Sequence, residues 1–306
     1  MPVVLATTSS FATHCPQLVE ALQSHGLELV CNPFGRKLTE PELRELLQRH
    51  CPVGLLAGTE PIGRDTLEAC RDTLRVVSRV GVGWDNVDKE AAAALGIKVY
   101  RTEGVLTQAV AELTLGMILS ALRQIPGHTR DICGGTWKKR MGGLLAGKTV
   151  GVVGFGAIGR RVAELVQAFG AKALFCDPVE PDACVCTACD LESIVSQADV
   201  ITLHASGSCC ILDAALLSRI KPGAILVNTA RGGLIDEAAL QEALASGRVA
   251  YACLDVFEKE PYTGPLAGLP NVVLTPHIGS YALEARILME EAAVDNLLSG
   301  LAATSD

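Results

Sequence analysis

Residues 149–177 contain the feature that most limits how this chain can fold. The apolar run VGVVG at residues 150–154 is followed by FGAIG and then by RRVAELVQAFG, so Gly154, Gly156 and Gly159 have Gly-x-Gly-x-x-Gly spacing. The first glycine permits a tight turn, the second leaves the backbone open to close approach, and the third lets the following helix pack against the strand. The segment therefore predicts a strand, a sharp turn and a helix.

A second strand-like run, AKALFCD, ends in Asp177, about 20 residues after the turn, as the dinucleotide-binding fold requires. In that fold a diphosphate meets the free N–H groups and the positive end of the helix. Asp177 would bind ribose hydroxyls and repel a 2′-phosphate, and Pro178 rather than an arginine follows it. The pattern predicts NAD rather than NADP; the alternative is a glycine-rich turn that binds nothing.

The rest of the chain alternates short apolar runs with segments of helical spacing. Continuous apolar runs separated by helices are typical of parallel sheets covered on both faces. The chain is therefore expected to be an α/β protein with two doubly wound parallel-sheet domains. We expect one domain at residues 1–100 plus 283–306 and the other at residues 101–282. Expected strands lie at residues 3–7, 27–31, 53–58, 74–80, 97–100, 148–154, 171–177, 199–204, 224–230, 249–255 and 271–276.

Some helix limits can also be read from the sequence. Thr39 with Glu42 predicts a capping box. A long helix is expected over 109–125 and a last one over 282–301.

Composition excludes several classes of function. The 306 residues carry a net charge of -8 without a basic block, so nucleic acid is a poor candidate partner. No apolar run is long enough to span a membrane, and the first residues lack the features of a signal peptide. We therefore expect a cytoplasmic protein whose twelve cysteines are reduced thiols. Cys184, Cys186 and Cys189 have a spacing that could bind a metal, but no second Cys or His cluster accompanies them, so no metal is predicted.

Three chemically capable residues follow successive expected strands of the second series. These are Arg231 in VNTARGGLID, Glu260 in DVFEKEP and His277 in TPHIGS. Parallel sheets bind ligands at the carboxyl ends of their strands. An arginine fork suits a 2-keto acid carboxylate, an imidazole can deliver a proton, and a carboxylate beside it would orient it and favour its charged form. The alternative is a helix-capping arginine, a solvated glutamate and a surface histidine.

These segments, together with VGVGWDNVD and AVAELTLGMILSALRQIP, resemble the D-isomer-specific 2-hydroxyacid dehydrogenases in the same order along nearly the whole chain. Within that family the chain is most similar to phosphoglycerate dehydrogenases that lack a regulatory tail. The resemblance implies a flavodoxin-like substrate domain, a Rossmann NAD-binding domain, a cleft between them, a last helix that returns to the first domain, and a homodimer.

The resemblance also assigns roles to residues. Arg231 is implied to bind and polarise the substrate, His277 to be the acid/base, and Glu260 to be its partner. The implied cofactor-binding residues are Gly154, Gly156, Ala157, Ile158, Gly159, Asp177, His204, Ser206, Thr229, Ala230, Asp255 and Gly279, with Asp255 on the nicotinamide side. The implied substrate-binding residues are Arg79, Gly81, Val82, Gly83 and Arg231.

The sequence departs from the family pattern in three places, one of which would affect the adenine side of the cofactor site. Ser206 stands where a proline is usual and the loop after His204 is shortened, Glu103 replaces another usual proline, and Leu56 stands where phosphoglycerate-specific members often have a basic residue. Arg36 and Lys37 could add positive charge to the site or belong to a solvated loop.

The expected function is NAD-dependent hydride transfer to a small 2-keto acid. 3-Phosphoglycerate is one candidate substrate, and glyoxylate, hydroxypyruvate or a phosphonate analogue are alternatives. The non-enzymatic alternative is an NAD-sensing, corepressor-like binding module.

Overall fold

The computed structural model describes residues 1–179, 186–207 and 209–303. The chain divides into two compact units, each with its own parallel sheet. Unit 1 comprises Met1–Leu106 and Ser280–Asp306, and unit 2 comprises Thr107–Gly279. The divisions fall within six residues of the limits expected from the sequence. The α/β class and the doubly wound parallel sheets are confirmed.

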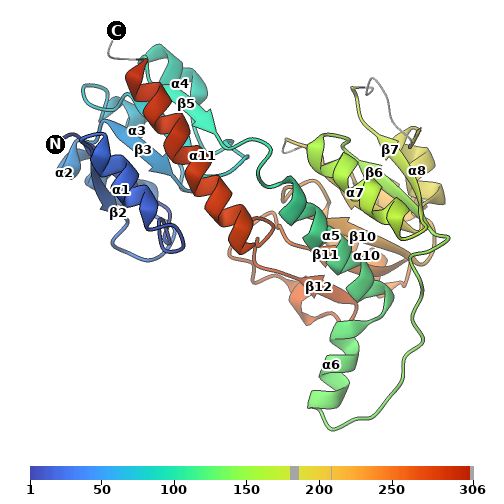
Figure 1. The fold of residues 1–306 in the computed structure, drawn as a ribbon. Helices are drawn as coiled ribbons and strands as arrows, with labels where there is room; N and C mark the ends of the chain where they lie inside the picture. The colour runs from blue at the N-terminus through green and yellow to red at the C-terminus, as the bar shows by residue number, and fades with distance from the viewer. Residues whose placement is uncertain (180–185, 208, 304–306) are drawn as a thin grey trace. The chain divides into compact units, whose positions relative to one another are not determined.

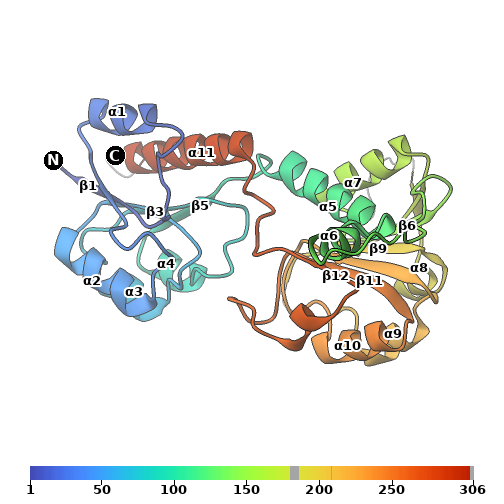
Figure 2. The ribbon, with the colours of Figure 1, turned by 90° about the horizontal axis from the view of Figure 1, so that it is seen from below.

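Unit 1 has a five-stranded sheet in the order β2-β1-β3-β4-β5, which is the flavodoxin-like order. Figure 2 shows helices on both faces of this sheet, with α1 and α11 on one side and α2, α3 and α4 on the other. Its elements are β1 (Val3–Ala6), α1 (Gln17–Ser24), β2 (Glu28–Cys31), α2 (Glu40–His50), β3 (Gly54–Ala57), α3 (Arg64–Glu68), β4 (Val76–Arg79), α4 (Lys89–Ala94), β5 (Lys98–Arg101) and α11 (Leu283–Ala302).

Unit 2 has a seven-stranded parallel sheet in the order β12-β11-β10-β9-β6-β7-β8, in which β6 is the central first strand of a Rossmann arrangement. Its elements are α5 (Thr107–Leu122), α6 (Ile125–Cys133), β6 (Thr149–Val153), α7 (Ala157–Ala168), β7 (Lys172–Cys176), β8 (Thr187–Ala188), α8 (Leu191–Gln197), β9 (Val200–Leu203), α9 (Ala214–Arg219), β10 (Ala224–Asn228), α10 (Glu237–Ala245), β11 (Val249–Leu254), the 3₁₀ helix η1 (Pro265–Gly268) and β12 (Val272–Leu274).

Two apolar cores hold the sheet of unit 2 between helical layers (Figure 1). On one face, residues of α5 and α7 such as Ile118 and Val162 pack against Val152 and Val227. On the other face, residues of α8, α9 and α10 pack against strands that include Leu226 and Leu254. Because β6, β9 and β10 are buried on both faces, their sequences are continuous apolar runs rather than alternating ones.

Unit 1 keeps its last helix through specific contacts. The Leu297 side chain lies so close to Gly54 that a Cβ on the glycine would be 2.8 Å away. Asn296 Nδ2 donates to the carbonyl of Arg101, and the buried Glu290 accepts from the backbone N–H of Ala12. The α11 segment, which comes last in sequence, is therefore part of the core of unit 1.

Two sequence expectations about individual elements need correction. The helix expected over 109–125 ends at Leu122, because Gln124 adopts a left-handed conformation and a separate helix, α6, begins at Ile125 with Pro126 in its first turn. The short strand β8 was not expected, since its two exposed residues give no apolar run. The capping interaction expected for α2 is present: the Glu42 carboxylate accepts from Thr39 N at 2.8 Å.

Candidate active site

The glycine turn after β6 has the geometry that each glycine was expected to provide. Gly154 has a φ of +90°, and a Cβ there would lie 2.4 Å from the backbone nitrogen of Ala205. A Cβ on Gly159 would lie 2.1 Å from the carbonyl oxygen of Gly154, so the third glycine permits close packing of α7. Gly156, the residue before α7, has open space where its Cβ would be. The N-terminus of α7 can therefore receive an anionic group.

Asp177 follows β7 and lies beside this turn. Its Oδ2 accepts from Phe155 N at 2.6 Å, and its Oδ1 accepts from Val179 N at 2.8 Å. The carboxylate therefore shapes the glycine turn as well as carrying charge at the strand end where a ribose would lie. This second, structural role was not foreseen from the sequence.

Arg231, Glu260 and His277 follow β10, β11 and β12, which are neighbours in the sheet. His277 Nδ1 lies 2.9 Å from Glu260 Oε2, and the two side chains are 48% and 38% exposed. Because Nδ1 is used by Glu260, Nε2 is the ring nitrogen left for a substrate. The structure thus brings the predicted acid/base and its carboxylate partner together at an accessible edge.

The loop that carries Arg231 is fixed by neighbours. The side chain of the buried Asn228 donates through Nδ2 to Arg231 O at 2.8 Å and accepts from Ala230 N at 3.0 Å. A Cβ on Gly232 would lie 1.8 Å from Phe257 O, and Gly233 has a φ of +80°. The two glycines therefore let the β10 and β11 loops touch and turn. Sequence reasoning missed Asn228, although a polar residue closing an apolar strand was a usable signal.

Asp255 holds the turn that presents His277. Its carboxylate is buried and accepts from Thr275 Oγ1 at 2.5 Å, Ile278 N at 2.8 Å and Gly279 N at 2.8 Å. His277 has a φ of +56°, which is uncommon for a residue other than glycine, and its N–H donates to Asp255 O. These bonds keep His277 in its strained backbone conformation. The predicted contact of Asp255 with the nicotinamide side stays a prediction.

Most of the remaining expected cofactor residues follow the carboxyl ends of β9 and β10. Burial lowers the pKa of His204 to about 3, so its ring is neutral at neutral pH. Its Nε2 lies 2.9 Å from Thr202 Oγ1, whereas its buried Nδ1 has no hydrogen-bond partner within the described part of the chain. Thr229 Oγ1 lies 2.8 Å from Thr114 Oγ1, a residue of α5 that sequence reasoning missed. Ala157 and Ile158 open α7, and Ser206 is exposed in the loop after β9.

The residues present fit a dinucleotide. An open glycine at a helix N-terminus, a carboxylate after the second strand and an orphaned buried imidazole nitrogen all lie on the same edge of the sheet. Gly154, Gly156, Ala157 and Ile158 would hold the diphosphate, and Asp177 the ribose.

In unit 1, the expected substrate residues follow β4. Gly81 has a φ of +148°, and a Cβ there would lie 2.3 Å from Arg79 Nη1. The buried Arg79 also donates from Nη1 to the carbonyl of Val80. Its guanidinium thus supports the loop that contains Gly81, Val82 and Gly83.

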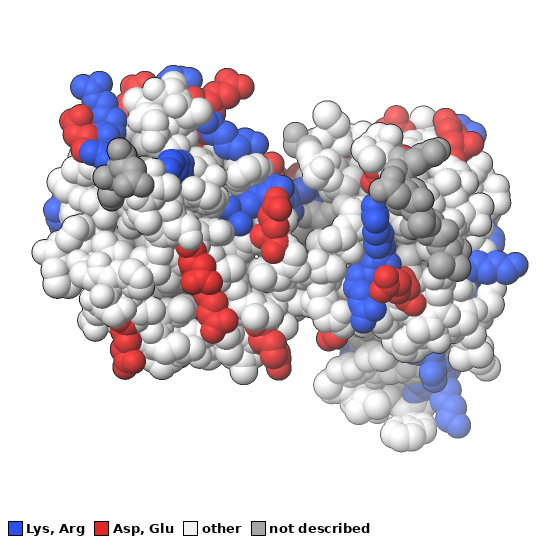
Figure 3. Space-filling view, turned by 45° about the horizontal axis from the view of Figure 1, so that its top comes forward, with Lys and Arg blue, Asp and Glu red and all other residues white. Residues whose placement is uncertain are grey.

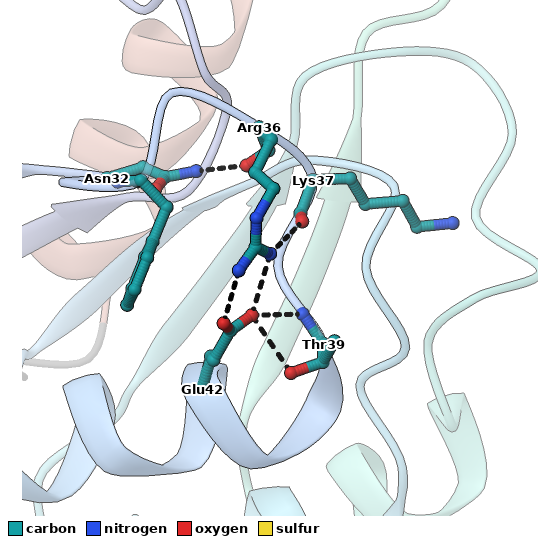
Figure 4. Close-up of polar contacts among 6 residues, drawn as sticks. Asn32, Arg36, Lys37, Thr39 and Glu42 are labelled. Atoms are coloured by element: carbon teal, nitrogen blue, oxygen red, sulfur yellow. Dashed lines mark hydrogen bonds and ion pairs between the residues drawn. The ribbon is translucent and has the colours of Figure 1, made fainter.

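Arg36 is not available as a general positive charge. Figure 4 shows its guanidinium facing Glu42, with Nη2–Oε1 at 2.6 Å and Nη1–Oε2 at 3.0 Å, while Lys37 extends away from this pair. Arg36 and Thr39 together hold the pKa of Glu42 well below its usual range, at about 2. The structure therefore favours the loop interpretation for Arg36, which fixes the start of α2.

The cysteine cluster lies partly outside the described residues, so the expectation that it holds no metal stays a prediction. Cys186 and Cys189 flank β8, and Cys184 lies outside the described residues. Over residues 1–179, 186–207 and 209–303, no group of three or more His, Cys, Asp or Glu side chains could hold a metal ion. None of the helices in these described residues is long and apolar enough to cross a membrane.

The fold and this site define a class of dehydrogenase, and comparison with known proteins identifies it. Residues 115–279, more than half of the chain, match the D-isomer specific 2-hydroxyacid dehydrogenase, NAD binding domain. The chain belongs to this family, which uses NAD to act on the CH–OH group of 2-hydroxy acids. The predicted family and cofactor are thereby confirmed.

The chain is similar to proteins that carry different enzyme names. A hydroxypyruvate reductase of Thermotoga maritima is 37% identical over 281 residues, which is 87% of this chain and 92% of that protein. A D-3-phosphoglycerate dehydrogenase of Methanocaldococcus jannaschii is 41% identical over 81% of this chain, and the match spans only 49% of that longer protein. The crystal structure of the TT0316 protein from Thermus thermophilus superimposes with a TM-score of 0.90 at 36% identity, covering 98% of this chain and 97% of that one.

Proposed function

We propose that this protein catalyses reversible hydride transfer between NAD(H) and C2 of a small 2-hydroxy or 2-keto acid, with Arg231, Glu260 and His277 as its catalytic residues. The observation that carries the proposal is the 2.9 Å contact between His277 Nδ1 and Glu260 Oε2. It leaves Nε2 as the proton donor at the edge of the sheet that also carries Arg231. A carboxylate that orients an imidazole in this way is a common device of acid/base catalysis.

In the reduction direction, the Arg231 guanidinium binds the keto-acid carboxylate and polarises the carbonyl. His277 donates its Nε2 proton to the carbonyl oxygen as C2 is reduced, and in the oxidation direction Nε2 accepts that proton from the hydroxyl group. Glu260 holds the ring and stabilises its charged form. When bound, NADH supplies the hydride. One keto acid, one NADH and one proton are consumed for each hydroxy acid and NAD⁺ formed.

Unit 2 would hold the cofactor through the glycine turn and through residues at the ends of its strands. The proposed contacts beyond the diphosphate and the ribose are His204, Ser206, Thr229, Ala230, Asp255 and Gly279. These assignments are supported by the position of the residues at the carboxyl ends of the unit 2 strands. The shortened loop after His204 makes the adenine side the part of this site most particular to the chain.

Unit 1 would be the substrate-binding unit. The backbone of Gly81, Val82 and Gly83 is proposed to bind the substrate carboxylate, with Arg79 as the residue that fixes this loop. The packing of Arg79 against Gly81 supports this assignment. 3-Phosphoglycerate, hydroxypyruvate and glyoxylate all carry the required two-carbon core, as does a phosphonate analogue.

A substrate panel tests the enzymatic proposal and separates it from an NAD-sensing binding module. Steady-state rates with NADH and NADPH should show turnover of at least one of phosphohydroxypyruvate, hydroxypyruvate and glyoxylate. Arg231→Lys keeps the charge but loses the planar fork, so kcat/KM should fall by at least tenfold while NADH binding is unchanged. The control is Arg219→Lys, at an exposed position of α9. Binding of NADH without turnover of any keto acid would favour the sensor.

We also propose that the protein is a homodimer joined through α6 and the segment that follows it. Exposed apolar side chains gather here, with Trp137 86% and Met141 93% exposed, and Ile125 and Leu144 line a groove beside them. Such a patch marks an interaction surface. Trp137→Ser with Met141→Ser should convert a dimer to a monomer by light scattering; an unchanged mass would place the interface elsewhere.

The cytoplasm is the proposed compartment. The ten described cysteines other than Cys186 are free thiols, as expected where disulfides are kept reduced. On the face drawn in Figure 3, Lys and Arg side chains lie beside Asp and Glu or are separated by uncharged areas. This mixed surface supports a small-molecule partner over nucleic acid.

A further inference from the structure

Unit 1 contains a buried carboxylate that the proposed mechanism does not use. Glu60 follows β3 and is only 1% exposed. Its Oε1 accepts from Gly58 N at 3.0 Å and from the hydroxyl of Thr7, the residue after β1. Among the residues that the structure describes, no lysine, arginine or histidine forms an ion pair with it. A buried carboxylate without a cation is costly, so its retention calls for an explanation.

The position of Glu60 points to a ligand. In the order β2-β1-β3-β4-β5, the chain winds to one side of β1 and then continues from β3 in the opposite direction. Ligands of doubly wound sheets bind outside the carboxyl ends of strands at such a switch point. Thr7 is the first residue after β1 and Glu60 is the third residue after β3, the two strands that flank it.

A second polar group at the same point lacks a partner. Thr8 Oγ1 is buried and forms no hydrogen bond with any described residue. Its Cα lies 3.6 Å from the position that a Cβ on Gly58 would occupy, which places it beside the Glu60 carboxylate. Buried hydroxyls are normally satisfied, so the Thr8 hydroxyl still needs a partner that no described residue provides and that a ligand could supply.

Most of the cationic side chains near the carboxyl ends of the unit 1 strands already have partners. Arg36 is paired with Glu42, as Figure 4 shows, and Arg79 supports the loop at Gly81. Arg101 pairs with Glu103 and lies over the Trp84 ring. Lys37 is exposed in the loop after β2, the outermost strand on this side. A phosphate dianion at the switch point would therefore meet the Glu60 carboxylate, while these three arginines are engaged elsewhere.

We infer that Thr8 and Glu60 form a subsite for the distal group of the substrate, and that this group is an uncharged hydroxyl donor rather than a phosphate. The inference rests on the proposed function and deepens it. It selects 2-keto acids of the hydroxypyruvate type over phosphohydroxypyruvate. Glu60 would accept a hydrogen bond from the hydroxyl and repel a phosphate.

The first test compares substrates with the unaltered protein. With NADH, kcat/KM for hydroxypyruvate should exceed that for phosphohydroxypyruvate by at least 100-fold, and pyruvate, which lacks the hydroxyl, should be at least tenfold poorer than hydroxypyruvate. Preference for the phosphorylated substrate, or equal rates with pyruvate and hydroxypyruvate, would overturn the inference.

The second test uses Glu60→Gln, which keeps an acceptor for Gly58 N but removes the charge. The ratio of kcat/KM for hydroxypyruvate to that for phosphohydroxypyruvate should fall at least tenfold, mainly through KM. A merely structural glutamate would lower both values equally. Glu68→Gln, an exposed charge at the end of α3, should leave the ratio unchanged.

Binding keeps the inference separate from the catalytic proposal. If no keto acid is reduced, the proposed function fails, and the subsite is then judged from the shift in Tm that D-glycerate or 3-phosphoglycerate produces in the presence of NAD⁺. A larger shift with D-glycerate supports the subsite. A larger shift with 3-phosphoglycerate, or no shift with either, contradicts it. This comparison needs no variant, so it holds even if Glu60→Gln does not fold.

Discussion

Gly232 and Phe257 lie in direct backbone contact: a Cβ on the glycine would be 1.8 Å from the carbonyl oxygen of Phe257. The contact joins the loop that carries Arg231 to the loop that carries Glu260. The distance between Arg231, the proposed substrate-binding cation, and Glu260, the proposed partner of His277, therefore depends on residue 232 having no side chain.

Replacing Gly232 should separate these loops. We expect Gly232→Ala to lower the free energy of unfolding by about 2 kcal/mol or more, as overpacking commonly does, and to lower kcat/KM for the keto acid by at least tenfold. The measurements are urea unfolding and steady-state kinetics. Gly116→Ala makes the same change in α5 where nothing lies within 4 Å, and it should leave both quantities intact or improve stability.

His277 combines a chemical role with an unusual backbone conformation. Asparagine tolerates a positive φ but cannot donate a proton as imidazolium does, so His277→Asn removes the chemistry and spares the turn. We expect kcat for reduction to fall by about 10²–10⁴-fold, with the Kd for NADH unchanged within about twofold. Single-turnover rates and fluorescence titration measure the two. Retained turnover in a folded variant would remove His277 from the mechanism.

Asp177 should enforce the choice of cofactor. Asp177→Asn keeps an oxygen that can accept from Phe155 N but removes the charge that repels a 2′-phosphate. The ratio of kcat/KM with NADPH to that with NADH should therefore rise at least tenfold. Asp190→Asn, at the start of α8, is the matched loss of charge and should not alter the ratio. A protein that already prefers NADPH would contradict the role given to Asp177.

His204 should make the fold sensitive to acid. Burial lowers its pKa from 6.5 to about 3, so the unfolded chain binds a proton that the folded chain does not. Its contribution is therefore complete above pH 6.5 and is lost as the pH falls from 6.5 towards 3, at about 1.4 kcal/mol per pH unit within that window.

We expect His204→Gln to reduce the loss of unfolding free energy between pH 6.5 and 5.0 by about 1.5 kcal/mol. Urea unfolding across this range measures the effect. His14→Gln, at an exposed position, serves as the control. Identical pH dependence in the wild type and His204→Gln would show that another group dominates.

The sequence predicted the helices and strands of the fold better than it predicted the residues that hold the proposed catalytic residues in place. Apolar runs such as AILVN place strands because burial on both faces leaves a continuous signal, whereas the exposed pair at Thr187–Ala188 leaves none. Arg231, Glu260 and His277 could be found because each comes within six residues of the end of a strand. Thr114 could not, because its contact with Thr229 joins residues 115 positions apart.

The structural duties of individual carboxylates were also beyond sequence reasoning. Asp255 and Asp177 each carry an expected cofactor role, but their bonds to backbone N–H groups depend on how two loops fold together. Glu60 was not singled out at all, since nothing in AGTEP shows that its side chain would be buried.

The placement of α11 has a consequence for how the protein is made. Residues 107–279 form one uninterrupted unit, while the face of the unit 1 sheet that α1 and α11 share is covered by α1 alone until Leu283–Ala302 has left the ribosome. During synthesis unit 2 can therefore complete its core first. Residues 1–106 are translated earlier but complete their core only when α11 has been made. Leu297 and Gly300 would then close unit 1 last, against Gly54 and Val76. A nascent chain stalled before residue 283 should expose the unit 1 sheet to proteases and chaperones.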